Sequence, residues 1–226
     1  MAGDGPERAI QKASRRELET RMRTEPKRNY LRRDRTGGFT IVELLVVLLV
    51  IMIITAVALP SFMQSYRIYQ LNDAANQVAG VLKFTRYEAI RLNVAAATPL
   101  KAQVRQSGSS PVITNVFTDS NNSGTVQSTA KQILLSGNVN LVSSNVPPNT
   151  SGLATAVGVS TLTNVSLSSG SIAFDQRGAV TPAAVNVFYI GNLALPNLGN
   201  RAVILLPSGS VQIWTTDASG NWQQLN

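Results

Sequence analysis

The stretch "RRDRTGGFTIVELLVVLLVIMIITAVALPSF", Arg32 to Phe62, runs from a basic cluster into a long apolar segment. From Phe39 to Leu59 the apolar residues are interrupted by Thr40, Glu43 and Thr55 alone. A helix of this length rises ~30 Å, which is enough to cross the hydrocarbon core of a bilayer. We therefore predict a transmembrane helix over residues 39–60.

The basic residues around this segment predict its orientation. Arg32, Arg33 and Arg35 come just before it, whereas the first basic residue after it is Arg67. The positive-inside bias therefore predicts a cytoplasmic N-terminus. Everything after about residue 60 is then expected outside the cytoplasm.

Two simpler interpretations of the segment remain open. A secretory signal peptide would use "AVA" at 56–58 as its cleavage site, although the apolar run is longer than the usual 7–15 residues and contains Glu43. The second interpretation is an ordinary membrane anchor, in which Glu43 has no functional role. A charge at the centre of a membrane helix costs roughly 2.5–3.5 kcal/mol, so this carboxylate is expected to have a partner.

"GGFTIVELLVVLLVIMIITAVALPSF" resembles the N-terminal signature of type IV pilins and of type II secretion pseudopilins. The resemblance implies that a prepilin peptidase cuts between Gly38 and Phe39 and methylates the new amino group of Phe39. It also implies that this amine pairs with Glu43 of a neighbouring subunit during assembly. Pro60 would then either kink the helix or end it at the membrane surface.

The segment before the cut, residues 1–38, is expected to be a leader peptide that is removed. It holds eleven Lys/Arg and six Asp/Glu, so it carries +5 of the net charge of +8. This basic character is therefore not evidence for a nucleic-acid partner. The leader begins at Met1 or, in a shorter form, at Met22.

Beyond the membrane, apolar residues recur at three- and four-residue intervals and predict an amphipathic continuation of the helix over residues 61–97. The alternative is a separate amphipathic helix that starts after Pro60. Either helix would pack its apolar stripe on a globular domain. The stripe consists of Leu71, Ala74, Ala75, Val78, Val81, Leu82, Ala89 and Leu92.

"FTRYEAIRLN", residues 84–93, is similar to the end of the long helix in the GspH/FimT branch of minor pseudopilins and minor pilins. Arg86, Glu88 and Arg91 are interpreted as solvated or docking-surface charges. "IAFDQRGAV" (172–180) and "RAVILLPSGSVQIW" (201–214) resemble two hairpins of the same branch. Gly178 and Pro207-Ser208-Gly209 would make their turns.

Residues 98–226 are predicted to form a β-rich periplasmic head, and residues 143–170 within them a long loop or loosely held strands. The fold class is α+β and pilin-like, with a long N-terminal helix packed on an antiparallel head. The expected strands are 101–106, 111–117, 131–135, 139–142, 171–174, 185–190, 201–206 and 210–214.

The composition excludes most enzyme mechanisms. The chain has neither histidine nor cysteine, so it lacks the commonest general base, thiolate nucleophiles and zinc-thiolate ligands. "FTDSNNSGT" (117–125) offers Asp119 and several oxygen donors, but it lacks the spaced carboxylates and terminal Glu of an EF-hand. We expect no catalytic residue, no cofactor and no metal.

The sequence thus predicts a non-enzymatic minor pseudopilin or minor pilin, a structural subunit of the type II secretion pseudopilus or of a type IV pilus. Its expected partners are other pilin or pseudopilin subunits, prepilin peptidase and an inner-membrane assembly platform. We expect a single-pass protein of the bacterial inner membrane that joins a fibre, with no nucleic-acid partner. The alternatives are a tip-binding module for DNA uptake or adhesion, and a secreted β protein with an ordinary signal peptide.

Overall fold

The structure, a computed structural model, describes residues 38–93, 102–109, 112–136 and 138–225. The predicted leader, apart from Gly38, lies outside these residues. The chain divides into two units, Met1–Val50 and Ile51–Asn226, which are described separately.

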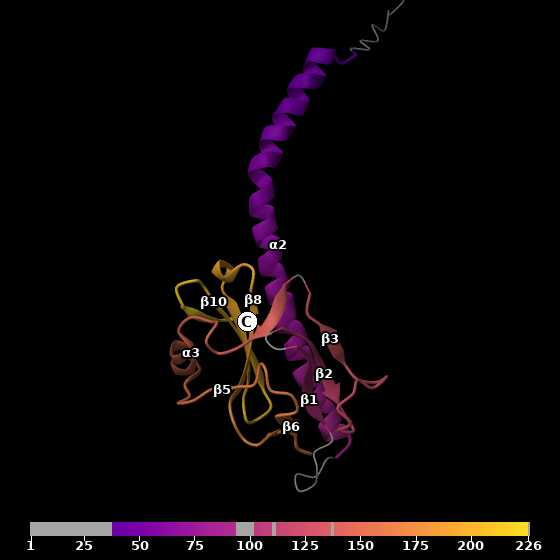
Figure 1. Ribbon diagram of the computed structural model, residues 1–226, viewed down its shortest axis with the longest axis vertical. Coiled ribbons are helices and arrows are strands. Elements are labelled where there is room, and N and C mark those ends of the chain that lie inside the picture. The colour runs from indigo at the N-terminus through magenta and orange to yellow at the C-terminus, as the bar shows by residue number, and fades with distance from the viewer. Residues whose placement is uncertain (1–37, 94–101, 110–111, 137, 226) are drawn as a thin grey trace, which may run out of the picture. The chain divides into compact units, whose positions relative to one another are not determined.

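One long helix, α2 (Ile41–Arg91), opens the described chain and continues through Pro60 (Figure 1). Proline has no amide hydrogen, so the carbonyl of Ala56 loses its usual helical donor there, but the helix does not end. The continuation of the helix that was predicted over residues 61–97 is present as far as Arg91, and residues 94–97 lie outside the described residues. Both alternatives, a helix-ending Pro60 and a separate second helix, are wrong.

The head is built on one sheet whose strands follow the order β11-β10-β9-β8-β4-β2-β1-β6-β7. In addition β3 pairs with β2, and the short β5 runs parallel to β8 in an otherwise antiparallel sheet. All eight predicted strands are present. The strands are β1 (Gln103–Ser109), β2 (Val112–Asp119), β3 (Gln132–Leu134), β4 (Val139–Val142), β5 (Thr163–Asn164), β6 (Ile172–Phe174), β7 (Val180–Thr181), β8 (Asn186–Asn192), β9 (Asn200–Leu205), β10 (Val211–Thr216) and β11 (Trp222–Leu225).

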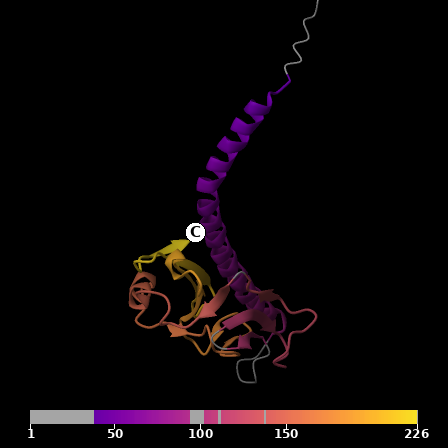
Figure 2. The ribbon, with the colours of Figure 1, turned by 45° about the horizontal axis from the view of Figure 1, so that its top comes forward.

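The second half of α2 lies along the sheet in both ribbon views (Figures 1 and 2) and supplies the main core. Seven of the eight residues of the predicted stripe are buried, and they pack with Phe188, Ile190, Val203 and Leu205 of the sheet. Leu92 is 40% exposed because the helix ends one residue before it. Packing of this stripe against the sheet therefore holds the head on the helix.

A second core lies on the other face of the sheet, because β8 alternates its side chains between the two faces. Val187 and Tyr189 pack there with Leu153 of the short helix α3 (Thr150–Val157). The prediction of a loop or loose strands over residues 143–170 is therefore wrong. Asn149 accepts the Gly152 amide at the start of α3, and Gly158 closes its end in the left-handed region.

The charged residues near the end of α2 are less exposed than predicted. Glu88 is 8% exposed and accepts both Nε and Nη2 of Arg91, at 3.1 and 2.7 Å. Arg86 is half-buried, and its Nε has no hydrogen-bond partner among the described residues. Of the three charges, Arg91 alone has the exposure that the sequence analysis expected.

Arg86 lies where the two predicted hairpin turns meet. Gly178 turns β6 into β7 with φ of +76°, and Gly209 turns β9 into β10 with φ of +79°. The amide of Val180 donates to the Pro207 carbonyl at 2.9 Å, which ties the two hairpins together. A Cβ on Gly178 would come 2.7 Å from Nε of Arg86. Both turn predictions are confirmed, and the close approach of Arg86 explains why these turns need glycine.

Gly209→Ala should therefore destabilise the head far more than Gly158→Ala. Both glycines have φ of +79°, so alanine costs about 1 kcal/mol of backbone strain at either position. At Gly158 the added Cβ meets open space, whereas at Gly209 it overlaps the carbonyl oxygen of Gly178. We expect an additional loss of about 2–3 kcal/mol at Gly209.

Denaturant unfolding of the full-length chain in detergent micelles, followed by tryptophan fluorescence, measures this difference. Equal losses of unfolding free energy in Gly209→Ala and Gly158→Ala would show that the two hairpins are not packed as described.

Candidate processing and assembly site

The segment Gly38–Thr40 precedes the first turn of α2 and is exposed. Phe39 is 78% exposed, and a Cβ built on Gly38 meets no atom within 4 Å. Neither crowding nor a positive φ therefore requires glycine at position 38. The peptide bond between Gly38 and Phe39 lies outside the helix, in an exposed segment without regular secondary structure.

Thr40 sets the boundary between this segment and the helix. Its hydroxyl accepts the backbone amide of Glu43 at 3.2 Å, and its carbonyl accepts the amide of Leu44 at 3.1 Å. These are the bonds of an N-cap residue, which satisfies amides that have no partner within the helix. This role was not predicted from the sequence, although the spacing T-x-x-E in "TIVE" is the signal of a capping box.

Glu43 lies in the first helical turn, where the positive end of the helix dipole favours a carboxylate. It is exposed, and within the described part of the chain no cationic side chain lies within ion-pair distance of it. The structure thus brings Gly38, Phe39 and Glu43 together at the start of one helix. Pro60, the fourth predicted residue, lies well inside the same helix.

The helix that follows is apolar enough to cross a membrane. Its most apolar 18-residue window has a mean hydropathy of 3.1, and no residue of that window is buried. Thr55 lowers the cost of its hydroxyl in hydrocarbon by donating to the Ile51 carbonyl at 2.7 Å. Of the helices in the described residues, α2 alone has this length and hydropathy.

A family described as the prokaryotic N-terminal methylation motif matches residues 33–59. No curated protein and no solved structure matches the chain. The motif supports a type IV pilin-like or pseudopilin class, whose members are processed by prepilin peptidase and interact with other pilin subunits. Together with the apolar helix it fits a single-pass, membrane-anchored structural subunit rather than an enzyme.

The cap at Thr40 can be tested without touching the proposed cleavage site. Thr40→Val keeps the size of the side chain but removes the acceptor, whereas Thr40→Ser retains it. An N-cap is worth about 1 kcal/mol, so the Glu43 amide should exchange its hydrogen about fivefold faster in Thr40→Val than in the parent chain. Hydrogen exchange in micelles measures this rate, and Thr40→Ser should exchange as the parent does. An unchanged rate in Thr40→Val would exclude the cap.

Proposed function

We propose that the chain is a minor pseudopilin or minor pilin of the GspH/FimT type, which prepilin peptidase cuts between Gly38 and Phe39. Residues 1–38 form the leader, residues 39–60 the membrane anchor and residues 98–226 the periplasmic head. The observation that carries the proposal is a freely accessible Gly38–Phe39 bond, directly followed by a capped apolar helix with Glu43 in its first turn. The arginines before the bond favour the cytoplasmic side for the cut.

The assembly role of Glu43 follows from charge. Removal of the leader turns the backbone nitrogen of Phe39 into a cationic amine, and a buried carboxylate regains favourable energy when it pairs with a cation. The pairing of Glu43 with Phe39 of an adjacent subunit would set the axial register of the fibre. A separate cytoplasmic ATPase would supply the energy for this step, because the sequence has no Walker-type nucleotide loop.

The head supports the GspH/FimT assignment through the three segments that carry the resemblance. Residues 84–93, 172–180 and 201–214 are far apart in the sequence, yet they meet around Arg86, whose Nη1 donates to the Gly209 carbonyl at 3.4 Å. A chance similarity of three isolated segments would not require them to be in contact. Their meeting therefore favours a shared architecture over three unrelated matches.

Three arginines favour assembly over binding of nucleic acid, because each is engaged in a contact within the protein. Arg91 pairs with Glu88 and Arg105 with Asp119, while Arg201 is buried and donates to Asn72. Nucleic-acid binding requires cations that are free to reach phosphates. These arginines are instead used within the protein.

Gly38→Ala should abolish processing and leave the fold intact. The added methyl group meets open space in the described structure, so the unfolding temperature should not change. Co-expression with a prepilin peptidase, followed by mass spectrometry, should give methylated Phe39 as the first residue of the parent chain and an uncut Gly38→Ala precursor. A parent chain that begins at Leu59 would instead identify a signal peptide and contradict the proposal.

Glu43→Gln separates the charge of this residue from its place in the helix. Glutamine fits the same position of a capping box but carries no charge, so membrane insertion and cleavage should be normal. Incorporation into fibres should fall at least about tenfold, which corresponds to the loss of about 1.4 kcal/mol per contact. Quantitative immunoblotting of sheared fibres measures this loss, with Glu43→Asp as the charged control. Wild-type incorporation of Glu43→Gln would refute the pairing while leaving the cleavage site intact.

A further inference from the structure

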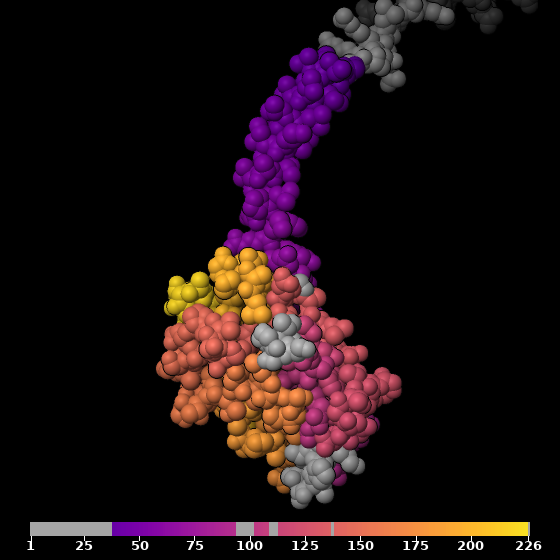
Figure 3. All heavy atoms as spheres, viewed as in Figure 1, coloured from indigo at the N-terminus to yellow at the C-terminus, as the bar shows by residue number. Residues whose placement is uncertain are grey.

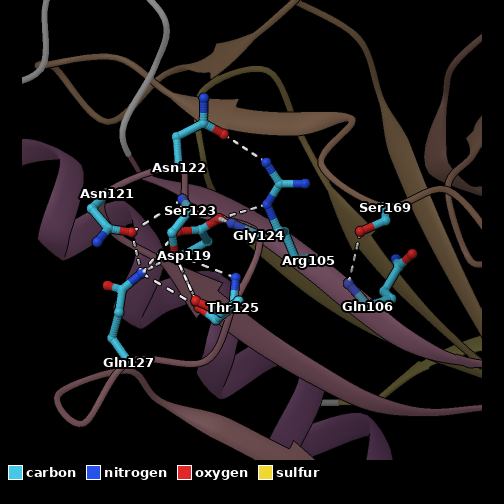
Figure 4. Close-up of polar contacts among 10 residues, drawn as sticks. All are labelled: Arg105, Gln106, Asp119, Asn121, Asn122, Ser123, Gly124, Thr125, Gln127 and Ser169. Atoms are coloured by element: carbon cyan, nitrogen blue, oxygen red, sulfur yellow. Dashed lines mark hydrogen bonds and ion pairs between the residues drawn. The ribbon is translucent and has the colours of Figure 1, made fainter.

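The loop between β2 and β3 is part of the surface of the head (Figure 3). Its oxygen atoms gather around one point (Figure 4). The side-chain nitrogen Nε2 of Gln127 occupies this point. It lies 2.9 Å from Oδ1 of Asp119, 3.2 Å from Oγ of Ser123 and 3.5 Å from the carbonyl oxygen of Thr125. Oδ1 of Asn121 contacts the same nitrogen. Four oxygens from four residues thus surround a single atom.

An amide nitrogen is a poor match for this environment. It carries two hydrogens, so at most two of the four oxygens can receive a well-formed hydrogen bond. The remaining oxygens approach it without a proton between them. A small cation, in contrast, attracts all of them equally, and four oxygens around one centre are the beginning of a calcium coordination shell.

The order of the residues along the loop independently points to a cation. Counted from Asp119, the oxygens come from positions 1, 3, 5 and 7, with the backbone carbonyl of Thr125 at position 7. Gly124 is at position 6 with φ of +77°, and Gln127 is at position 9. This is the spacing by which calcium loops place their ligands, including the glycine that makes the sharp turn.

Contacts outside the cluster hold the first ligand in place. Oδ2 of Asp119 accepts Nε of Arg105 at 2.6 Å and the amide of Gly124 at 2.8 Å, while Oδ1 faces the centre and also accepts the amide of Ser123 at 3.1 Å. Asn122 lies in the same loop but turns away, and its Oδ1 accepts Nη2 of Arg105 at 2.6 Å. Figure 4 shows the two directions: Asn121 points toward Gln127, whereas Asn122 points toward Arg105.

We propose that the loop 119–127 binds a calcium ion at the place of the Gln127 amide. The half-buried Gln127 would swing out, or turn its Oε1 toward the ion, and water would complete the shell. No metal was expected from the sequence, because the loop has a single carboxylate and Ala130 at position 12. The lack of further carboxylates affects how tightly the loop binds calcium. With one carboxylate, itself shared with Arg105, the expected Kd is in the weak class of about 10⁻⁴–10⁻³ M.

The ligand chemistry selects calcium over other metals. Every donor is an oxygen, and the chain contains neither histidine nor cysteine, which zinc prefers. Magnesium requires near-ideal octahedral geometry at 2.0–2.1 Å and gives up water reluctantly. An exposed loop, with the Gln127 side chain at its centre, suits the larger and less demanding calcium ion. This proposal does not depend on the pilin assignment.

The test uses the full-length chain in detergent micelles, stripped of metal with EGTA and titrated with calcium chloride at constant ionic strength. Trp214 and Trp222 in the head report thermal unfolding. At 10 mM calcium and a Kd of about 1 mM, the unfolding temperature should rise by about 3–6 °C. Magnesium at the same concentration should give less than half this shift.

Two substitutions of Gln127 give opposite predictions. Gln127→Lys places an ammonium group at the centre, so the chain should be stable in EGTA and show no calcium shift. Gln127→Glu places a carboxylate among the four oxygens. Without calcium these groups repel one another, so the variant should unfold at a lower temperature in EGTA than the parent chain. Calcium should raise its unfolding temperature by more than it raises that of the parent. Both changes are at a half-buried position, which makes misfolding a smaller concern than at Asp119.

A matched pair of asparagines supplies the control. Asn121→Ala removes a ligand and should weaken calcium binding about tenfold, as measured by titration calorimetry. Asn122→Gly removes the neighbouring amide, which faces Arg105, and its φ of +56° suits glycine, so its Kd should be unchanged. The proposal is overturned if neither the parent chain nor Gln127→Glu responds to calcium. It is also overturned if Gln127→Lys responds as the parent does, because the ion then binds elsewhere.

Discussion

A single carboxylate in the first turn of an apolar helix constrains the rest of the proposed biology. The helix dipole and the cap at Thr40 make Glu43 acceptable at that end of α2, but neither neutralises its charge in a hydrocarbon environment. Among the described residues no cation does so either. The proposed cleavage after Gly38 would create the missing cation on the adjacent residue. One proteolytic step would thereby change a costly charge into a means of recognition between subunits.

The head is held to α2 in two ways. Apolar packing of the stripe against the sheet forms the larger of the two cores, and it tolerates many sequences of similar volume. The contact of Arg86 with the turns at Gly178 and Gly209 is more specific, because a side chain larger than hydrogen has no room at either turn. This explains why the segments of the head that carry the resemblance are the ones around Arg86.

The sequence was sufficient wherever a periodic or positional signal was strong. The apolar run, the stripe from Leu71 to Ala89, the alternating strands and the two glycine turns all predicted the observed elements. Helix α3 was missed because all its residues except Leu153 are small or β-branched, and its caps, Asn149 and Gly158, are in a segment full of turn formers. Glu88 was misassigned because its burial depends on the tertiary packing of α2. The oxygen cluster at Asp119 was dismissed because the loop lacks spaced carboxylates and a terminal Glu, and the sequence does not show that its other oxygen donors surround one point.

Along helix α2, the same apolar residue types face two different environments, lipid and the protein interior. Leu49 is 60% exposed and meets lipid in the proposed membrane anchor, whereas Leu82 is fully enclosed by protein. Lipid is fluid, so exchanging Leu49 for another apolar residue should alter little, while the same exchange at Leu82 must respect a fixed volume. Before residue 60, substitutions in α2 during evolution should therefore be restricted to apolar residues but not to one side-chain volume. At the buried positions after residue 70, both polarity and volume should be restricted.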